Sequence, residues 1–123
     1  MTDNVVLEKS IRFAERIVKL NLYLKSKNEF VLSNQILKSG TSIGANITES
    51  VRAQSEADFL TKLTIALKEA DETKYWLHLL ITGEYLDEKA YESLRNDCEE
   101  IIKLLVSITK TVKLKTDKEK SDK

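Results

Sequence analysis

Two long segments in the second half of the chain carry apolar or small residues at alternating spacings of three and four. That repeat is typical of helices that pack together in a bundle. The first segment presents Phe59, Leu63, Ala66, Ala70, Thr73, Leu77 and Leu80. The second presents Tyr91, Leu94, Cys98, Ile101, Leu105, Ile108 and Val112. No stretch of similar length alternates with the period of a strand, and the chain has no Pro, so the pattern predicts an all-α fold.

The first half of the chain adds two more predicted helices. We expect one over about residues 4–24, and a second that begins within residues 30–33 and ends near residues 52–54. Because short turns between long helices make neighbours antiparallel, we predict an up-down-up-down four-helix bundle over residues 1–112. Residues 113–123 are rich in Lys and hold a single apolar residue, which predicts a frayed, mobile tail.

Residues that favour helix ends support the boundaries of the last two helices. Ser55, followed three positions later by Asp58, resembles a capping box that opens the third helix. Gly83 is expected to end this helix in a left-handed conformation, and Asp87 is expected to cap the fourth helix.

The second predicted helix differs from the others because polar residues fall on its apolar seam. It also holds Gly40 and Gly44, and a helix-interior Gly costs about 1 kcal/mol relative to Ala. We interpret this region as a structural polar layer in which Asn46 hydrogen-bonds across the core. The predicted layer consists of Ser39, Asn46, Glu69 and Thr73. A ligand or phosphate site is the alternative, although these small residues do not form a glycine loop at a helix start.

Composition and charge narrow the classes of function. The chain has 20 basic and 20 acidic residues, so its net charge is zero, which argues against a surface that binds nucleic acid over its whole extent. No apolar run is long enough to cross a membrane, and no secretory signal is evident. A single Cys fits a reducing compartment. We therefore expect a cytoplasmic protein.

Residues that could support catalysis do not form a recognisable pattern. His78 is the only His, and Tyr75 occupies the position where a di-iron bundle would need Glu. Cys98 lies on an apolar seam, where a thiol is usually inert. Glu69 and Glu72 lie one turn apart and could act as acid and base, but this spacing is common on helices. We expect no catalytic residues, no metal, no cofactor and no small-molecule substrate, and hence not an enzyme.

A basic stripe and an apolar patch are the two candidate interaction surfaces. The basic stripe consists of Lys9, Arg12, Arg16 and Lys19, which recur at helical spacing. It could contact phosphates, or it could be a solvated face paired with Glu8 and Glu15, which is the favoured interpretation. The apolar patch consists of Ile65, Tyr75, Trp76 and Leu79, on the face of the third helix away from its seam. We predict that it is an oligomer interface, unless the chain itself covers it.

Three segments of the sequence resemble the bacterial 23S ribosomal-RNA intervening-sequence protein family. They are residues 35–47 (QILKSGTSIGANI), 58–70 (DFLTKLTIALKEA) and 72–77 (ETKYWL), within a resemblance that covers about residues 4–112. The resemblance implies a small four-helix bundle that assembles into a ring-like homopentamer. Some members are encoded inside intervening sequences of ribosomal-RNA genes, and a related retroelement accessory protein binds nucleic acid and a reverse transcriptase. No enzymatic activity is established for the family.

Together these expectations favour a non-enzymatic, homo-oligomeric accessory factor that binds RNA or DNA. The alternative is a protein-binding scaffold with no role in nucleic-acid binding. The zero net charge favours the scaffold, and the resemblance favours the accessory factor.

Overall fold

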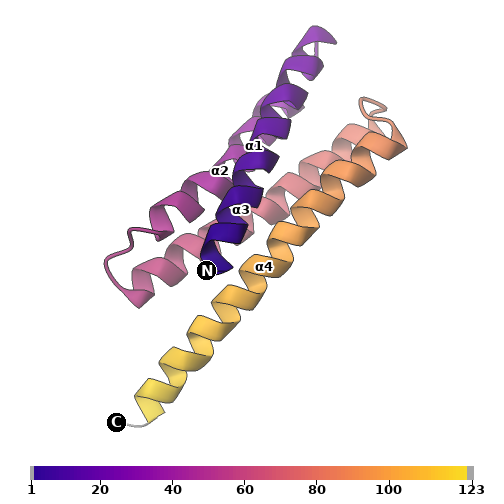
Figure 1. The fold of residues 1–123 in the computed structure, drawn as a ribbon. Helices are drawn as coiled ribbons and strands as arrows, with labels where there is room; N and C mark the ends of the chain where they lie inside the picture. Colours follow the sequence, from indigo (N-terminus) through magenta and orange to yellow (C-terminus); the bar gives the residue numbers. More distant parts are fainter. Residues whose placement is uncertain (1, 122–123) are drawn as a thin grey trace.

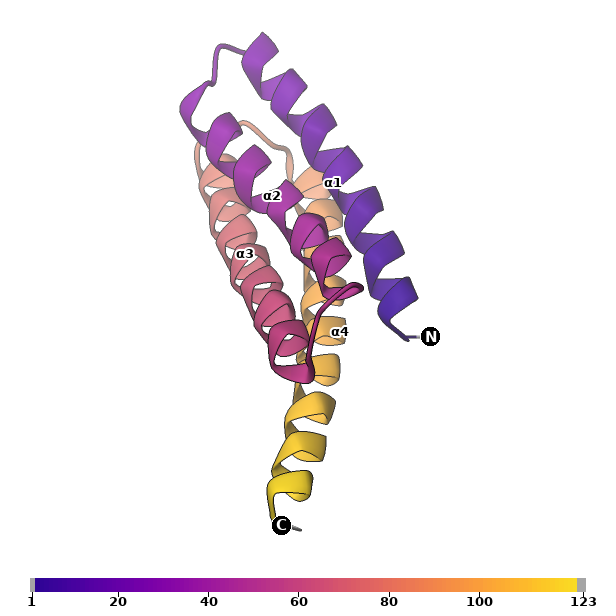
Figure 2. The same ribbon diagram turned by 90° about the vertical axis from the view of Figure 1, so that its left-hand side faces the viewer.

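The computed structural model describes residues 2–121 (Figure 1). It consists of four α-helices joined by short turns. The helices are α1 (Thr2–Ser26), α2 (Val31–Ser50), α3 (Glu56–Thr82) and α4 (Glu88–Ser121). Successive helices run in opposite directions and pack side by side, as Figures 1 and 2 show. No strand occurs within residues 2–121, so the prediction of an all-α four-helix bundle is confirmed. None of these four helices is long and apolar enough to cross a membrane.

The core of the bundle follows the middle of the predicted seams, whereas the seam residues Phe59, Tyr91, Ile108 and Val112 near the helix ends are only half-buried. On α3 the buried positions are Leu63, Ala66, Ala70, Thr73, Leu77 and Leu80. On α4 they are Leu94, Cys98, Ile101, Leu105 and Thr109. The helix α1 contributes Val6, Phe13, Ile17, Leu20 and Leu24. Burial of these side chains is the main favourable contribution to folding.

Helices α1 and α2 approach each other closely at the two glycines of α2. A Cβ atom on Gly40 would lie 2.9 Å from both Cγ1 and Cγ2 of Ile17. A Cβ atom on Gly44 would lie 3.2 Å from Oγ of Ser10 and 3.5 Å from its backbone oxygen. Close helix packing therefore accounts for both glycines, and neither position indicates a ligand site.

The N-terminal caps of α3 and α4 agree with the sequence, with one difference. The Ser55 side chain accepts a hydrogen bond of 3.0 Å from the backbone N–H of Asp58. Asp58 in turn accepts from the backbone N–H of Gln54, one residue earlier than a capping box requires. Asp87 accepts a 2.7 Å bond from the backbone N–H of Ala90, which confirms the predicted cap.

The predicted left-handed conformation at Gly83 is wrong. Gly83 has φ −80°, and the left-handed residue is its neighbour Glu84, with φ 64°. The backbone N–H of Glu84 bonds to the Ile81 carbonyl, and that of Tyr85 bonds to the Leu80 carbonyl. These two bonds form a Schellman motif, which needs its left-handed residue one position after Gly83.

The C-terminal segment is helical as far as Ser121, whereas the sequence predicts a frayed tail over residues 113–123, of which residues 122–123 lie outside those that the structure describes. This end of α4 projects beyond the other three helices (Figure 2). The segment contains neither Gly nor Pro, and two contacts hold it to the start of α3. Lys115 Nζ lies 3.1 Å from Glu56 Oε1, and the Thr116 hydroxyl lies 3.5 Å from Glu56 Oε2. The α-helix therefore extends past residue 112, where the sequence predicts its end.

The close approach of α1 and α2 predicts the effect of Gly40→Ala. Overpacking against Ile17 costs about 1–3 kcal/mol, whereas Ala gains about 1 kcal/mol of helix propensity. We expect a net destabilisation of about 1 kcal/mol, measured by chemical denaturation. Gln35→Ala on the exposed side of α2 is the control and should not destabilise. In an Ile17→Ala background the sign should reverse, and a Gly40→Ala cost that persists there would contradict the packing explanation.

Candidate functional site

Two members of the predicted polar layer meet in the core between α2 and α3. The Thr73 hydroxyl donates a hydrogen bond of 2.9 Å to the Ser39 hydroxyl, and both residues are buried. The Thr73 hydroxyl also lies within bonding distance of the backbone oxygen of Glu69, at 2.8 Å. Because both hydroxyls have partners, this pair is a satisfied structural contact.

The predicted role of Asn46 in this layer is wrong. Its side-chain nitrogen donates to the backbone oxygen of Ser42, on its own helix, at 2.9 Å. The side chain is only half-buried, and the neighbouring Ile47 occupies the core position. The physical reason is that Gly40 and Gly44 face α1, which widens the buried side of α2 to include Ile47 and leaves Asn46 at its edge.

The side chain of Glu69 lies on the flank of α3 and does not bond across the core. Its pKa is raised, first by burial and then by the charge of Glu72, while Lys38 of α2 acts in the opposite direction. A side-chain hydrogen bond between Glu69 and Glu72 contributes to the same rise in pKa. Glu69 therefore holds its proton more tightly than a free Glu does.

The single thiol is enclosed by the bundle. Cys98 is fully buried, and its Sγ lies 3.3 Å from the backbone oxygen of Ala70. Burial raises the pKa of Cys98 to about 12. Such a thiol stays protonated and is a poor nucleophile at neutral pH. Among the described side chains, those of residues 5–121, no three of His, Cys, Asp or Glu lie close enough together to hold a metal ion.

The basic stripe of α1 lies beside α4 and is partly neutralised by it. Lys9 Nζ lies 2.9 Å from Glu100 Oε1, and Arg16 Nη1 lies 2.6 Å from Asp97 Oδ2. The Arg16 guanidinium also donates to the Ser93 hydroxyl at 3.1 Å. The expected partners Glu8 and Glu15 form no ion pair in the described part of the chain, so that expectation is wrong. The actual partners lie on the neighbouring helix α4, because the basic stripe faces α4.

Arg12 and Lys19, the other two members of the stripe, are exposed and belong to no ion pair among the side chains of residues 5–121. Arg12 lines a small cavity of about 210 Å³ together with Lys9, Phe13, Asp97 and Glu100. The cations that remain free to contact a ligand are therefore fewer than the sequence suggests.

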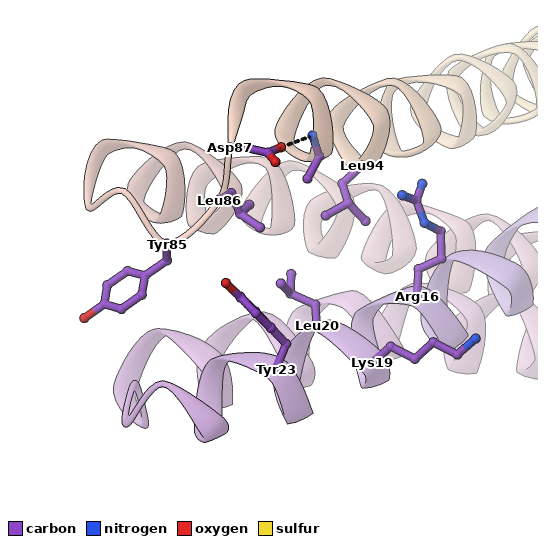
Figure 3. A pocket seen from close by; sticks show the side chains of 9 residues that line it. Arg16, Lys19, Leu20, Tyr23, Tyr85, Leu86, Asp87 and Leu94 are labelled. Atoms are coloured by element: carbon purple, nitrogen blue, oxygen red, sulfur yellow. Dashed lines mark hydrogen bonds between the residues drawn. The ribbon is translucent and has the colours of Figure 1, made fainter.

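A larger cavity of about 570 Å³ lies where α1 meets the turn between α3 and α4 (Figure 3). It is lined by Arg16, Lys19, Leu20, Tyr23, Tyr85, Leu86, Asp87, Ala90 and Leu94. The sequence offers no reason to group the two tyrosines, because they lie on segments that only the packing of α1 against α4 brings together. No spacing rule within one helix would identify this cavity.

The predicted apolar patch on α3 is divided between core and surface. Tyr75 and Ile65 are exposed by 55% and 36%, whereas Trp76 and Leu79 are half-buried. Trp76 packs against the core of its own chain and meets Tyr75 edge-on, with ring centroids 5.0 Å apart. Its Nε1 is buried and has no hydrogen-bond partner within the described residues. The patch thus lies on the flank of α3 and not directly opposite the seam.

A second apolar surface runs along the outer side of α1. Ile11, Val18 and Leu22 are exposed by 48%, 43% and 64%. Their spacings of seven and four place them on one face of the helix. This stripe is a second exposed apolar surface of the bundle, on a different helix from the patch of α3.

Charge is distributed unevenly along α4. Residues 88–109 hold five acidic and three basic side chains, whereas residues 110–121 hold five Lys and two acidic side chains. Lys110, Lys113, Lys118 and Lys120 are exposed and form no ion pair with any side chain of residues 5–121. The end of α4 that projects from the bundle is therefore the most cationic part of this helix.

Comparisons with known proteins identify a family and similar solved structures. A family model described as 23S rRNA-intervening sequence protein matches residues 2–107. A crystal structure of a protein of unknown function from the S23 ribosomal protein family of Bacteroides thetaiotaomicron is 61% identical. The match covers 89% of this chain and 99% of that chain, with a TM-score of 0.88. No curated protein matches the chain.

The burial of Cys98 predicts low thiol reactivity. At pH 8 a thiol-specific reagent should modify the native protein at least about a hundredfold more slowly than the protein in denaturant, because the native pKa is about 12. The unfolded thiol ionises at a lower pH, so Cys98 should also reduce stability as pH rises from about 9 toward 12. Rapid modification of the native protein, followed by mass spectrometry, would show that the thiol is accessible.

Proposed function

The chain belongs to the 23S rRNA-intervening sequence protein family, and from this premise we propose that it is a non-enzymatic, homo-oligomeric bundle that binds RNA or DNA as an accessory factor. The description of the family refers to 23S rRNA, and the structural neighbour is named for an S23 ribosomal protein family. The proposal applies these associations with ribosomal RNA to this chain.

The observation that carries the proposal is the lysine-rich end of α4. This segment projects beyond the bundle (Figure 2), where a nucleic acid can reach it from several sides. Four of its five Lys form no ion pair with the described side chains of residues 5–121, so they can contact phosphates without first breaking one. Contacts of this kind release counterions and give salt-dependent affinity.

The basic stripe of α1 has a smaller part in this proposal than the sequence suggests. Lys9 and Arg16 are held by Glu100 and Asp97 on α4, and a phosphate would have to compete with these carboxylates. Arg12 and Lys19 are the members of the stripe that would contribute to binding. Assembly would repeat these weak contacts in every subunit and so strengthen them through multivalency.

The proposed assembly uses two different apolar surfaces of each chain. One is the patch around Ile65 and Tyr75 on α3, and the other is the stripe of Ile11, Val18 and Leu22 on α1. A contact between unlike surfaces is heterologous, and repetition of such a contact closes a ring when the rotation allows. We propose a ring, and a pentamer on the basis of the family resemblance.

A protein-binding scaffold is the second candidate function. The same exposed apolar surfaces favour it, because clusters of exposed apolar side chains mark protein interfaces. The zero net charge and the neutralised half of the basic stripe also favour it. The two candidates differ in one property, which is salt-dependent binding to RNA.

The lysine-rich end of α4 predicts how RNA binding should respond to mutation. Replacement of Lys110, Lys113, Lys118 and Lys120 by Gln should weaken binding to a structured RNA at least about tenfold in 0.1 M salt. The slope of log affinity against log salt should become less negative by about 0.7–0.9 for each phosphate that the variant no longer neutralises. Fluorescence anisotropy with a labelled RNA hairpin at several salt concentrations measures both quantities.

A matched variant separates a local effect from a general loss of charge. Arg52, Lys68, Lys89 and Lys103 are also exposed and outside the ion pairs, and their replacement by Gln removes the same number of charges elsewhere. This variant should bind nearly as well as the native protein. An equal loss in both variants would reject the end of α4 as the interface, and no RNA binding at low salt would reject the proposed function in favour of the scaffold.

The heterologous interface predicts a specific result when two defective chains are mixed. Ile65→Glu with Tyr75→Glu should disable the α3 surface, and Val18→Glu with Leu22→Glu should disable the α1 surface. Each double variant alone should be a folded monomer, because these side chains are exposed. A mixture of the two variants keeps one intact pair of surfaces and should form a dimer but no ring.

Sedimentation velocity at micromolar concentration distinguishes these species. Val106→Glu is the control, because Val106 is 45% exposed on α4 and lies outside both proposed surfaces. It should assemble as the native protein does. A native protein that sediments as a monomer would refute the proposed assembly, and so would double variants that still form the full oligomer.

A further inference from the structure

The cavity at the end of the bundle has two chemically different ends. Figure 3 shows the rings of Tyr23 and Tyr85 at one end and the side chains of Arg16 and Lys19 at the other. Leu20, from α1, lies between these two ends and forms part of the lining. The cavity volume of about 570 Å³ is within the range of small-ligand sites in proteins. An aromatic end and a cationic end within one cavity suit a ligand that has both a flat ring and an anionic group.

The two cationic side chains of the cavity differ in whether they are already paired with other groups of the protein. Arg16 is held by Asp97 and Ser93 of α4, so it is fixed in position but largely neutralised. Lys19 is exposed and belongs to no ion pair in the described part of the chain. Lys19 is therefore the cation that an incoming anion would meet.

The two tyrosine rings at the aromatic end are accessible, and each contacts neighbouring side chains. Tyr23 is 48% exposed, and Lys27 Nζ lies over its ring, 5.7 Å from the centroid. Tyr85 is half-buried, packs against the core and comes from the turn before α4. Neither phenol oxygen has a hydrogen-bond partner within residues 2–121, so neither ring is held in place by its hydroxyl.

We propose that this cavity binds one nucleotide unit, with its base against the rings of Tyr23 and Tyr85 and its phosphate at Lys19. Lys19 and Tyr23 lie four residues apart, a rise of about 6 Å along α1, which is comparable to the length of the sugar that separates base from phosphate. Stacking of bases on aromatic side chains, combined with a cation for the backbone, is the usual mode of single-strand binding.

Asp87 at the rim of the cavity argues for a nucleotide over a purely anionic ligand. Its Oδ1 accepts from the backbone N–H of Ala90 as the cap of α4, and this bond holds the carboxylate in the cavity wall. A carboxylate disfavours a ligand that presents only phosphate or sulfate. A nucleotide avoids this repulsion, because it presents its neutral base on one side and places its anion at Lys19. Leu86 and Leu94 extend the apolar lining beneath the base.

The nucleotide has two sources, namely a free mononucleotide or an unpaired residue of a single strand. The second source rests on the proposed function, whereas the first does not. The test therefore uses AMP, a ten-nucleotide single-stranded oligoadenylate, an RNA duplex of the same length, and inorganic phosphate as separate probes. Titration calorimetry gives affinity, and amide chemical shifts of the assembled full-length chain report whether the cavity is the site.

Three variants separate stacking from other effects. Tyr23→Leu with Tyr85→Leu should weaken binding of AMP and of the single strand at least about fivefold, because the base can no longer stack. Tyr23→Phe with Tyr85→Phe keeps the rings and should restore binding. Lys19→Gln should weaken binding of the single strand and flatten its salt dependence. Phe59→Leu is the matched control, because Phe59 lies at the start of α3, whereas the cavity lies beyond the end of that helix, and this variant should bind normally.

Each outcome decides between the two proposals. The nucleotide site is supported if phosphate and the duplex bind weakly, and if binding of AMP and the single strand is lost in the double Leu variant (the Leu pair) but kept in the double Phe variant (the Phe pair). RNA binding that is unchanged in the Leu pair, without shifts at the cavity, overturns the nucleotide site and leaves the proposed function in place. Binding of AMP without binding of any RNA supports the site and refutes the proposed function. Should the Leu pair fail to fold, absence of shifts at the cavity with AMP and with the single strand overturns the inference.

Discussion

The absence of side chains at Gly40 and Gly44 determines how closely α1 can lie against α2. Ile17 and Ser10 of α1 occupy the space that Cβ atoms at these positions would need. Once α1 is held there, the directions of its other faces are fixed as well. One face packs in the core, the basic stripe turns toward α4, and an apolar stripe is left on the outside. The ion pair of Arg16 with α4 is thus a consequence of packing on the opposite side of α1.

The seams of α3 and α4 can be predicted because many residues follow the same periodicity. A wrong assignment at one position therefore changes the predicted seam very little. The seam of α2 cannot be extrapolated in this way. Its small residues give only a weak hydrophobic periodicity. The glycines determine which face of α2 packs against α1, and they do so by their small size, which a pattern of hydrophobicity does not detect. Periodicity therefore places Asn46 in the core, whereas Ile47 actually fills that position. Residue preference misses the left-handed position at Gly83 by a single residue, because the hydrogen bonds of the Schellman motif decide which residue is left-handed.

The candidate site is less predictable than the fold. The stripe of four cations is visible on one helix, but its partners on α4 are not, because cross-helix pairs depend on the rotation of both helices. The same is true of the cavity formed by Tyr23 and Tyr85. These residues belong to different segments, and only the meeting of α1 with the turn before α4 places their rings at one end of a shared cavity. Local sequence patterns predict which residues are available, and the three-dimensional packing decides which of them act together.

A net charge of zero does not describe the surface of this protein, because the charges are separated along α4. The acidic side chains of residues 88–109 include Asp97 and Glu100, which pair with α1 and so hold the bundle together. The lysines of residues 110–121 have few such partners, since this part of the helix has left the bundle. In the part of α4 that packs against α1, charged side chains form ion pairs between the helices. In the part that projects from the bundle, charged side chains remain available for a ligand. An extended helix whose free end is cationic can engage a polyanion without loosening the contacts that keep the four helices folded.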